Sequence, residues 1–138
     1  MGSTIDMQFM RYLNLFGRIT KVNTRHCFRY NEALIFCVPK HLISKAIGEN
    51  ANNIKQISKI LNKKIKIIAL PKDIKDAKLF ISSIIAPVSF KNVEITPEEI
   101  ILTAGSSNKA ALIGRNKRRL LEMQKIIKDF FKRYFRIV

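Results

Sequence analysis

Two stretches of the sequence match each other at one constant offset, which is the distance along the chain from Gly48 to Gly114. In each stretch a glycine interrupts a segment that otherwise has the apolar spacing of a helix, and an asparagine follows two positions later. The matched pairs are Ile47 and Ile113, Gly48 and Gly114, Asn50 and Asn116, Ile54 and Leu120, and Ile57 and Met123. Such self-similarity indicates that one structural unit occurs twice along the chain.

The chain length and one charged segment divide the sequence into two units. A chain of 138 residues accommodates one ordinary domain or two small ones, and the repeat favours two. In the segment 71–76 a proline is followed by four charged residues in five, which is typical of a boundary. We therefore expect a first unit over residues 1–71 and a second over residues 72–138.

Both units predict the same order of elements: helix, strand, strand, helix, helix, strand. In the first unit, Thr4 is expected to cap the first helix and Gly17 to end it. The other elements expected there are strands 24–30 and 33–38, helices 41–47 and 52–61, and strand 64–70. Those of the second unit are helix 77–85, strands 88–95 and 99–103, helices 108–113 and 117–131, and strand 134–138. Paired strands followed by paired helices favour an α+β fold, with a sheet covered on one face, over a doubly wound α/β sheet.

The charge of the chain points to a polyanionic partner. Its 26 Lys and Arg residues against 10 Asp and Glu give a formal net charge of +16, which attracts nucleic acid. The excess is uneven, because residues 109–138 hold ten basic and two acidic side chains, whereas residues 92–108 hold three acidic and no basic ones. A basic surface confined to part of the chain suits a binding face.

The glycine corners are candidates for binding a phosphate group. Glycine adopts positive φ without strain, so another backbone can approach closely, and the next helix begins with N–H groups that lack intrahelical acceptors. In the second unit, a salt-sensitive attraction is added by the basic residues around this turn, Arg115, Lys117, Arg118 and Arg119. A single helix–glycine–helix corner usually needs its glycine only for the turn. Two such corners at the same offset, one of them basic, favour a ligand site.

The pattern Ile-Gly-x-x-Gly-x-x-Ile between two helices is characteristic of KH domains, and both corners resemble it. The predicted order of helices and strands resembles the type II arrangement of that family. The duplication, the length and the ending FFKRYFRIV most resemble the archaeal NusA-like transcription factors, which consist of little besides two KH units. The resemblance covers nearly the whole chain. It implies two tandem type II KH domains, each a three-stranded sheet with helices on one face.

The resemblance also implies where RNA would bind. In KH domains the four-residue loop contacts the sugar–phosphate backbone of about four single-stranded nucleotides. The matching loops here are Gly48, Glu49, Asn50 and Ala51 in the first unit and Gly114, Arg115, Asn116 and Lys117 in the second. Both loops depart from the pattern, because Ala51 and Lys117 stand where the second glycine is expected.

The two loops differ in charge, which predicts unequal binding. Glu49 places a carboxylate beside the phosphate, which nearby lysines offset only in part, whereas Arg115 supplies a planar donor for two phosphate oxygens. The weaker site is expected to comprise Gly48, Asn50, Lys45 and Lys55. The dominant site is expected to comprise Gly114, Arg115, Asn116, Lys117, Arg118 and Arg119. Candidates for lining an adjacent groove, for which a place in the core is nevertheless favoured, are Ile47, Ile54, Ile113 and Leu120.

We expect a non-catalytic RNA-binding protein that, by the resemblance, modulates transcription elongation or termination and contacts RNA polymerase. Two alternatives stay open: a KH-type protein of ribosome assembly or RNA decay, and an adaptor whose KH folds bind protein. His26 and His41 lack visible partners for nucleophilic chemistry, and neither loop matches a dinucleotide or Walker A motif. We therefore expect no catalysis, no cofactor and no metal. The chain is expected to be a cytoplasmic monomer without a membrane-spanning segment.

Two further features leave alternatives open. Cys27 and Cys37 are expected on adjacent strands of a hairpin that turns near residues 31–32. Buried free thiols are favoured, and a cross-strand disulfide is the alternative. The ending from Gln124 mixes aromatic and basic side chains. Its aromatic residues either complete the core of the second unit, which is favoured, or stack on bases or lie on an anionic membrane.

Overall fold

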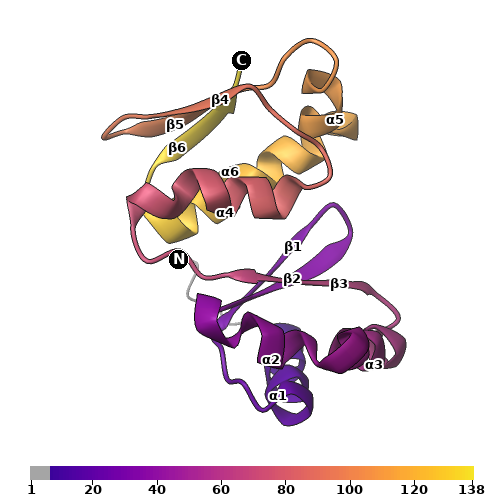
Figure 1. The fold of residues 1–138 in the computed structure, drawn as a ribbon. Helices are drawn as coiled ribbons and strands as arrows, with labels where there is room; N and C mark the ends of the chain where they lie inside the picture. The colour runs from indigo at the N-terminus through magenta and orange to yellow at the C-terminus, as the bar shows by residue number, and fades with distance from the viewer. Residues whose placement is uncertain (1–6) are drawn as a thin grey trace. The chain divides into compact units, whose positions relative to one another are not determined.

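The computed structural model describes residues 7–138, so the expected cap at Thr4 lies outside the described residues. The chain divides into two compact units, Met1–Leu70 and Pro71–Val138 (Figure 1). The first contains α1 (Met7–Thr20), β1 (His26–Tyr30), β2 (Ala33–Val38), α2 (Ile43–Ile47), α3 (Asn52–Leu61) and β3 (Lys64–Ala69). The second contains α4 (Ala77–Ile85), β4 (Asn92–Ile95), β5 (Glu99–Thr103), α5 (Lys109–Ile113), α6 (Arg118–Phe131) and β6 (Tyr134–Ile137). The order of elements is the predicted one in both units, and the α+β class is confirmed.

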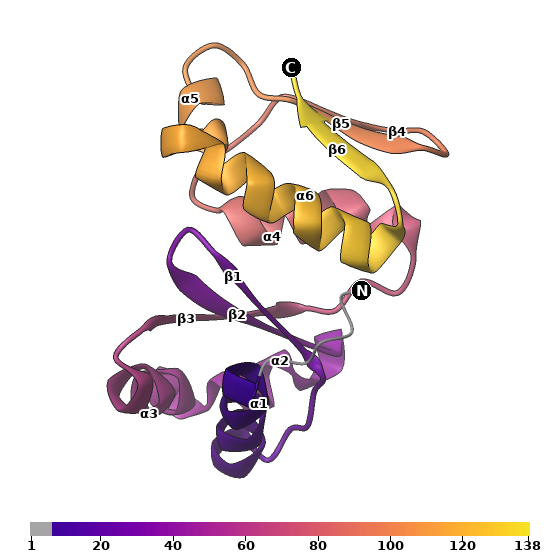
Figure 2. The ribbon, with the colours of Figure 1, turned by 180° about the vertical axis from the view of Figure 1, so that it is seen from behind.

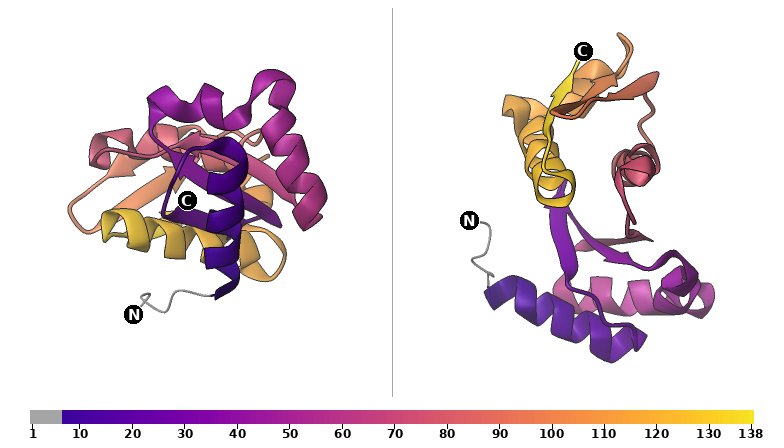
Figure 3. Two further views of the ribbon diagram at one scale, coloured as in Figure 1. Left: turned by 90° about the horizontal axis from the view of Figure 1, so that it is seen from below. Right: turned by 90° about the vertical axis from the view of Figure 1, so that its left-hand side faces the viewer.

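Each unit is built on one three-stranded mixed sheet, in the order β1-β2-β3 or β4-β5-β6. The central strand runs antiparallel to its hairpin partner and parallel to the last strand of the unit. The helices of each unit lie on one face of its sheet (Figures 2 and 3). The first hairpin turns at Asn31 and Glu32, whose φ angles of 50° and 65° suit a two-residue turn that follows the twist of the strands.

The core of the first unit lies between β2 and the helices α1 and α3. Leu34, Phe36 and Val38 alternate along β2 and belong to one cluster of buried side chains. The rings of Phe16 and Phe36 stack with their centroids 4.3 Å apart, and Ile57 of α3 is fully buried. Burial of each such side chain contributes about 1.5–3 kcal/mol. Alternate residues of the central strand therefore hold both helices against the sheet.

The core of the second unit is arranged in the same way. Ile100 and Leu102 alternate on β5 and are buried, as is Ile127 of α6. The ring of Phe80 on α4 packs against that of Phe130, with 4.8 Å between centroids. Apolar residues at alternate positions of the central strand are thus buried again, together with apolar residues of the longer helix.

One difference between the units lies in the length of the last helix. α3 and α6 begin at matched positions of the repeat, but α3 has 10 residues and α6 has 14. The four added residues are close to the 3.6 residues of one helical turn, and the added turn rotates the following chain by only about 40°. The sheet register is preserved, because Leu34 pairs with Ile65 as Ile100 pairs with Phe135.

Two predicted boundaries are wrong by three residues or more, and the others differ from the structure by at most two. α1 does not end at Gly17 but continues to Thr20, and the left-handed residue that ends it is Lys21, with a φ of 62°. A Cβ on Gly17 would lie 2.7 Å from a side-chain oxygen of the loop that follows, so this glycine makes room for the loop. β4 begins at Asn92 instead of residue 88, because its partner strand ends at Thr103, which pairs with Asn92.

The two cysteines are free thiols on opposite faces of the first sheet. Cys27 pairs with Phe36 and therefore shares its face, whereas Cys37 pairs with His26 and points to the other face. The pleat of the hairpin thus excludes the cross-strand disulfide. Burial raises the pKa of Cys27 to about 12, and it also raises the pKa of Cys37, so both thiols are protonated at neutral pH.

Candidate nucleic-acid interface

The two glycine corners have the same unusual backbone conformation. Gly48 has φ 83° and ψ 165°, and Gly114 has φ 78° and ψ 170°. This region is essentially restricted to glycine. A Cβ on Gly48 would lie 2.9 Å from the side chain of Asn53, and one on Gly114 would lie 2.8 Å from Cγ of Arg119. Backbone torsion and packing therefore both require glycine at the two corners.

The next residues of each corner form a tight turn with two left-handed residues. Asn50 has φ 55° and ψ 30°, and Asn116 has φ 57° and ψ 28°. Ala51, with φ 58°, and Lys117, with φ 60°, are also left-handed. Asparagine tolerates this conformation, whereas other residues with a Cβ pay about 1–2 kcal/mol for it. The two substitutions at the second glycine position thus leave the turn intact and place strain in it.

The hydrogen bonds of the second corner identify the amides that remain for a ligand. The N–H of Lys117 donates to the carbonyl of Gly114 at 3.1 Å, and that of Arg118 donates to the carbonyl of Arg115. Arg115 and Asn116 are the first two residues of this turn, so their N–H groups have no acceptor inside it. Free amides were expected at the start of the longer helix, and the structure places them in the loop instead. The first corner has the same hydrogen bonds, from Ala51 to Gly48 at 3.1 Å and from the next residue to Glu49.

A side-chain clamp fixes each corner from the far side. Nδ2 of Asn53 donates to the carbonyls of Lys45 and Ala46 at 3.3 and 3.2 Å, at the end of α2. Nη1 of Arg119 donates to the carbonyl of Ala111 at 2.8 Å, at the end of α5. Asn53 and Arg119 each follow the corner glycine by five positions, so they occupy the same place in the repeat. Sequence reasoning missed Asn53, although its alignment with Arg119 was a signal for it.

The exposed side chains of the two corners differ in charge. In the second corner, which joins α5 to α6 (Figure 1), the exposed residues are Arg115, Asn116, Lys117 and Arg118, while Gly114 and Arg119 are half-buried. In the first corner the exposed residues are Glu49 and Asn50, with Lys45 on α2 and Lys55 on α3 also exposed and Gly48 half-buried. The structure thus brings three cations onto one exposed turn in the second unit, where the first unit presents a carboxylate.

The apolar residues considered as a groove lining lie at the edge of the cores. Ile47, Ile54, Ile113 and Leu120 are all half-buried. Ile47 and Ile54 pack against the buried cluster of the first unit. These two side chains therefore support the corner, as the favoured interpretation of the sequence predicted.

The described part of the chain offers little for other kinds of site. Residues 7–138 contain no group of three or more His, Cys, Asp or Glu side chains that could hold a metal ion. Over the same residues no helix has both the length and the apolar character needed to cross a bilayer. Burial, followed by the charge of Arg25, lowers the pKa of His26. This histidine is therefore neutral at pH 7.

Comparison with known proteins gives relatives of one kind. No family model matches the chain. The "Probable transcription termination protein NusA" of Thermoplasma acidophilum is 23% identical over 147 residues, which cover 97% of this chain and 91% of that protein. The protein of the same name from Halococcus morrhuae is 25% identical over 138 residues, covering 94% and 97%. That from Methanococcus vannielii is 31% identical over 81 residues, covering 59% and 45%.

A solved structure shares the fold. The crystal structure of APE1850 superposes with a TM-score of 0.66 at 23% sequence identity, covering 97% of this chain and 99% of that one. The similarity extends across both units. It shows that the tandem arrangement of these two folds also occurs in another chain.

Proposed function

We propose that this chain, a homologue of archaeal NusA-like transcription termination proteins over nearly its full length, binds single-stranded RNA through the corner of its second unit. The turn that contacts the RNA consists of Gly114, Arg115, Asn116 and Lys117. Arg118 lies beside it. The free amides of the loop and the exposed cations act together on the sugar–phosphate backbone.

One observation carries the proposal. The exposed second corner, with Arg118 directly after it, combines three cations with two N–H groups that have no acceptor inside its tight turn. Hydrogen bonds from such groups to a charged oxygen contribute about 1.5–3 kcal/mol each. Because the backbone path is held by the glycine torsion and by the Arg119 clamp, little of this energy is spent on ordering the loop.

The proposed role in transcription is supported by the names of the relatives, and RNA binding is the means by which we propose that the chain acts. A protein that holds nascent RNA modulates the elongation or termination of the polymerase that produces it. RNA polymerase is accordingly the second partner that we propose. The chain acts by binding, without catalysis or a cofactor, and the first corner contributes less because Glu49 would place a carboxylate beside a phosphate.

The test is RNA affinity measured across a salt series. The variant Arg115→Gln, Lys117→Gln, Arg118→Gln removes the three exposed cations and leaves the Arg119 clamp in place. We expect about a 100-fold loss of affinity at low salt. The slope of log affinity against log salt should also fall by about two, since each lost contact with a single strand removes about 0.7.

A matched control removes the same charge elsewhere. Lys40, Lys59 and Lys64 are exposed lysines of the first unit, outside its predicted site. Their triple change to Gln lowers the net charge equally and should change affinity only a few-fold. Equal affinity and slope for the two triple variants would remove the second corner from the RNA site.

A further inference from the structure

The solvent-exposed side of α6 carries a row of cations that begins at the second corner. Arg118, Lys125, Lys128 and Lys132, which we call the cationic row, are all exposed. The spacings of seven and three residues place Arg118, Lys125 and Lys128 on one side of the helix, and Lys132 follows its last residue as the left-handed cap. α6 has 14 residues and therefore spans about 20 Å, from the corner to the start of β6 (Figure 2).

An exposed tyrosine lies at the far end of this row. Among the aromatic residues of the segment 124–138, Phe131 and Phe135 are buried, whereas Tyr134 is 68% exposed. Nζ of Lys128 lies 4.3 Å from the centroid of the Tyr134 ring. The sequence favoured a core role for the terminal aromatic residues, and Tyr134 departs from it. Aromatic side chains that lie along a positively charged surface are groups on which proteins stack unpaired bases.

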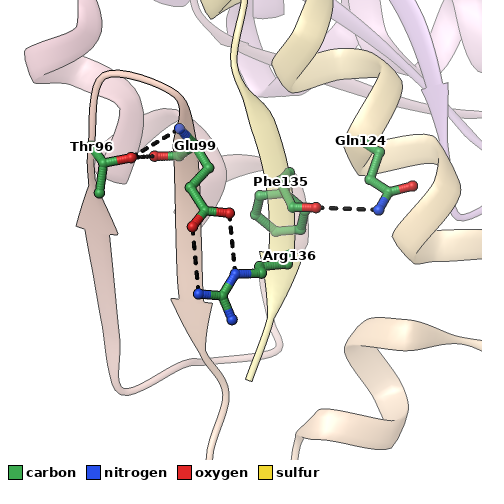
Figure 4. A network of polar contacts seen from close by, with 5 residues as sticks. All are labelled: Thr96, Glu99, Gln124, Phe135 and Arg136. Carbon is green, nitrogen blue, oxygen red and sulfur yellow. Dashed lines mark hydrogen bonds and ion pairs between the residues drawn. The ribbon is translucent and has the colours of Figure 1, made fainter.

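The acidic residues nearby leave the row positive. Glu122 is half-buried and Asp129 is exposed, and both lie toward one edge of the row. Arg136 is not counted, because its guanidinium group is held by the carboxylate of Glu99, with Nε 3.1 Å from Oε2 (Figure 4). Four cations therefore face solvent against two carboxylates.

The first unit lacks this arrangement. In the sheet register that the two units share, the strand position of Tyr134 is occupied by Lys64. α3 is shorter by four residues, so the helix ends before it could carry a row of the same length. The extra turn of α6 and the tyrosine after it thus occur only in the unit whose corner is basic.

We propose that single-stranded RNA held at the second corner continues along the cationic row and stacks one base on Tyr134. This proposal rests on the proposed function, because the strand must first be gripped at Gly114–Lys117. RNA fits better than a membrane, since the row contains cations with a single exposed leucine, Leu121, and no apolar face to insert. It fits better than an acidic protein because the ring offers a stacking surface to each kind of base.

The experiment compares oligonucleotides of two lengths on the full chain. Fluorescein-labelled oligo(U) and oligo(A) of four residues should reach the corner alone, whereas those of ten residues should also reach Tyr134. We expect Tyr134→Ala to weaken binding of the ten-residue RNAs about tenfold and to leave the four-residue RNAs unchanged. Tyr134→Phe, which keeps the ring, should bind like the unchanged chain, and Tyr134→Leu should behave like Tyr134→Ala.

A second variant tests the cations. Lys125→Gln, Lys128→Gln, Lys132→Gln should lower the salt slope for the ten-residue RNAs by about two, while the control change of Lys40, Lys59 and Lys64 leaves it unchanged. Binding to phosphatidylserine vesicles serves as a parallel measurement. Vesicle binding that is lost in this variant while RNA binding is kept would overturn the proposal in favour of a membrane.

The two proposals fail in different ways. If the four-residue RNAs bind and depend on Arg115 and Lys117, but the ten-residue RNAs are indifferent to Tyr134→Ala, the track along α6 is refuted and the corner stands. If neither length depends on Arg115 and Lys117, the proposed function itself is refuted. Thermal unfolding of each variant shows whether the fold is kept, as expected for exposed side chains.

Discussion

The corner of the first unit and that of the second follow the same backbone path, yet only the second carries cations in its loop. Their glycines have φ angles of 83° and 78°, and the asparagines that follow have 55° and 57°. The side chains at the second and fourth loop positions are Glu and Ala in one corner and Arg and Lys in the other. The fold therefore determines the path of the backbone, whereas the charge of each corner is determined by the side chains that this path leaves exposed.

The largest effect should come from giving the second corner the side chains of the first. Arg115→Glu with Lys117→Ala replaces two cations by one carboxylate on an unchanged backbone. We expect RNA affinity at 0.1 M salt to fall about 100-fold, because charge-assisted contacts are lost and a repulsion is added. Fluorescence anisotropy with single-stranded RNA measures the loss. An unchanged affinity would show that the charge difference between the two loops does not affect RNA binding.

The glycines should be equally sensitive in the two units. Gly48→Ala and Gly114→Ala each force a Cβ into a torsion region restricted to glycine, and the new atom would lie within 3 Å of a neighbouring side chain. We expect each change to lower the free energy of unfolding by about 2 kcal/mol, measured by urea unfolding. RNA binding should suffer more from the change at Gly114 than from the change at Gly48. A large difference in stability between the two variants would show that the corners are not held alike.

The reverse exchange should strengthen the site of the first corner. Glu49→Arg with Ala51→Lys gives the first corner the charge pattern of the second, again on the same backbone. We expect about a tenfold gain in affinity and a salt slope that rises by about 1.4, since two phosphate contacts of about 0.7 each are added. Measurement of RNA affinity across a salt series gives both quantities. The variant Glu49→Gln, which removes only the repulsion, is the control and should gain less.

Much of the fold could be predicted because the sequence repeats it. A pattern that appears once is ambiguous, but alternating residues such as Leu34 and Phe36, matched by Ile100 and Leu102, define the same side of both central strands. The predicted end of α1 was wrong because Gly17 looks like a helix stop when seen alone. The absence of a side chain at Gly17 instead makes room for the loop that follows α1. Hydrophobic periodicity does not predict a contact of this kind.

The position of the site could be predicted from the sequence. The groups that are available to bind a ligand there could be predicted only in part. The repeat located both corners, and the charges around Arg115 and Lys117 singled out the second. The tight turn after Gly114 determines which amides are free. Its hydrogen bonds engage N–H groups that would have no partner at the start of an isolated helix. The clamp of Arg119 is a contact between two helices, which the sequence does not show. From its residue type we expected Arg119 to bind the ligand, but one nitrogen of its guanidinium group already donates a hydrogen bond to a backbone carbonyl.

The smallest effect concerns the strain at the second glycine position. Ala51→Gly and Lys117→Gly each remove a Cβ from a left-handed residue, which favours the folded state, while glycine also gains freedom in the unfolded chain. The balance predicts a stabilisation of about 0.5–1 kcal/mol at both corners by urea unfolding. RNA affinity should separate the two, because Lys117→Gly also removes a cation from the loop and Ala51→Gly removes none. A chain that becomes more stable and binds RNA less tightly would show that Lys117 is retained for its charge at a cost to the fold.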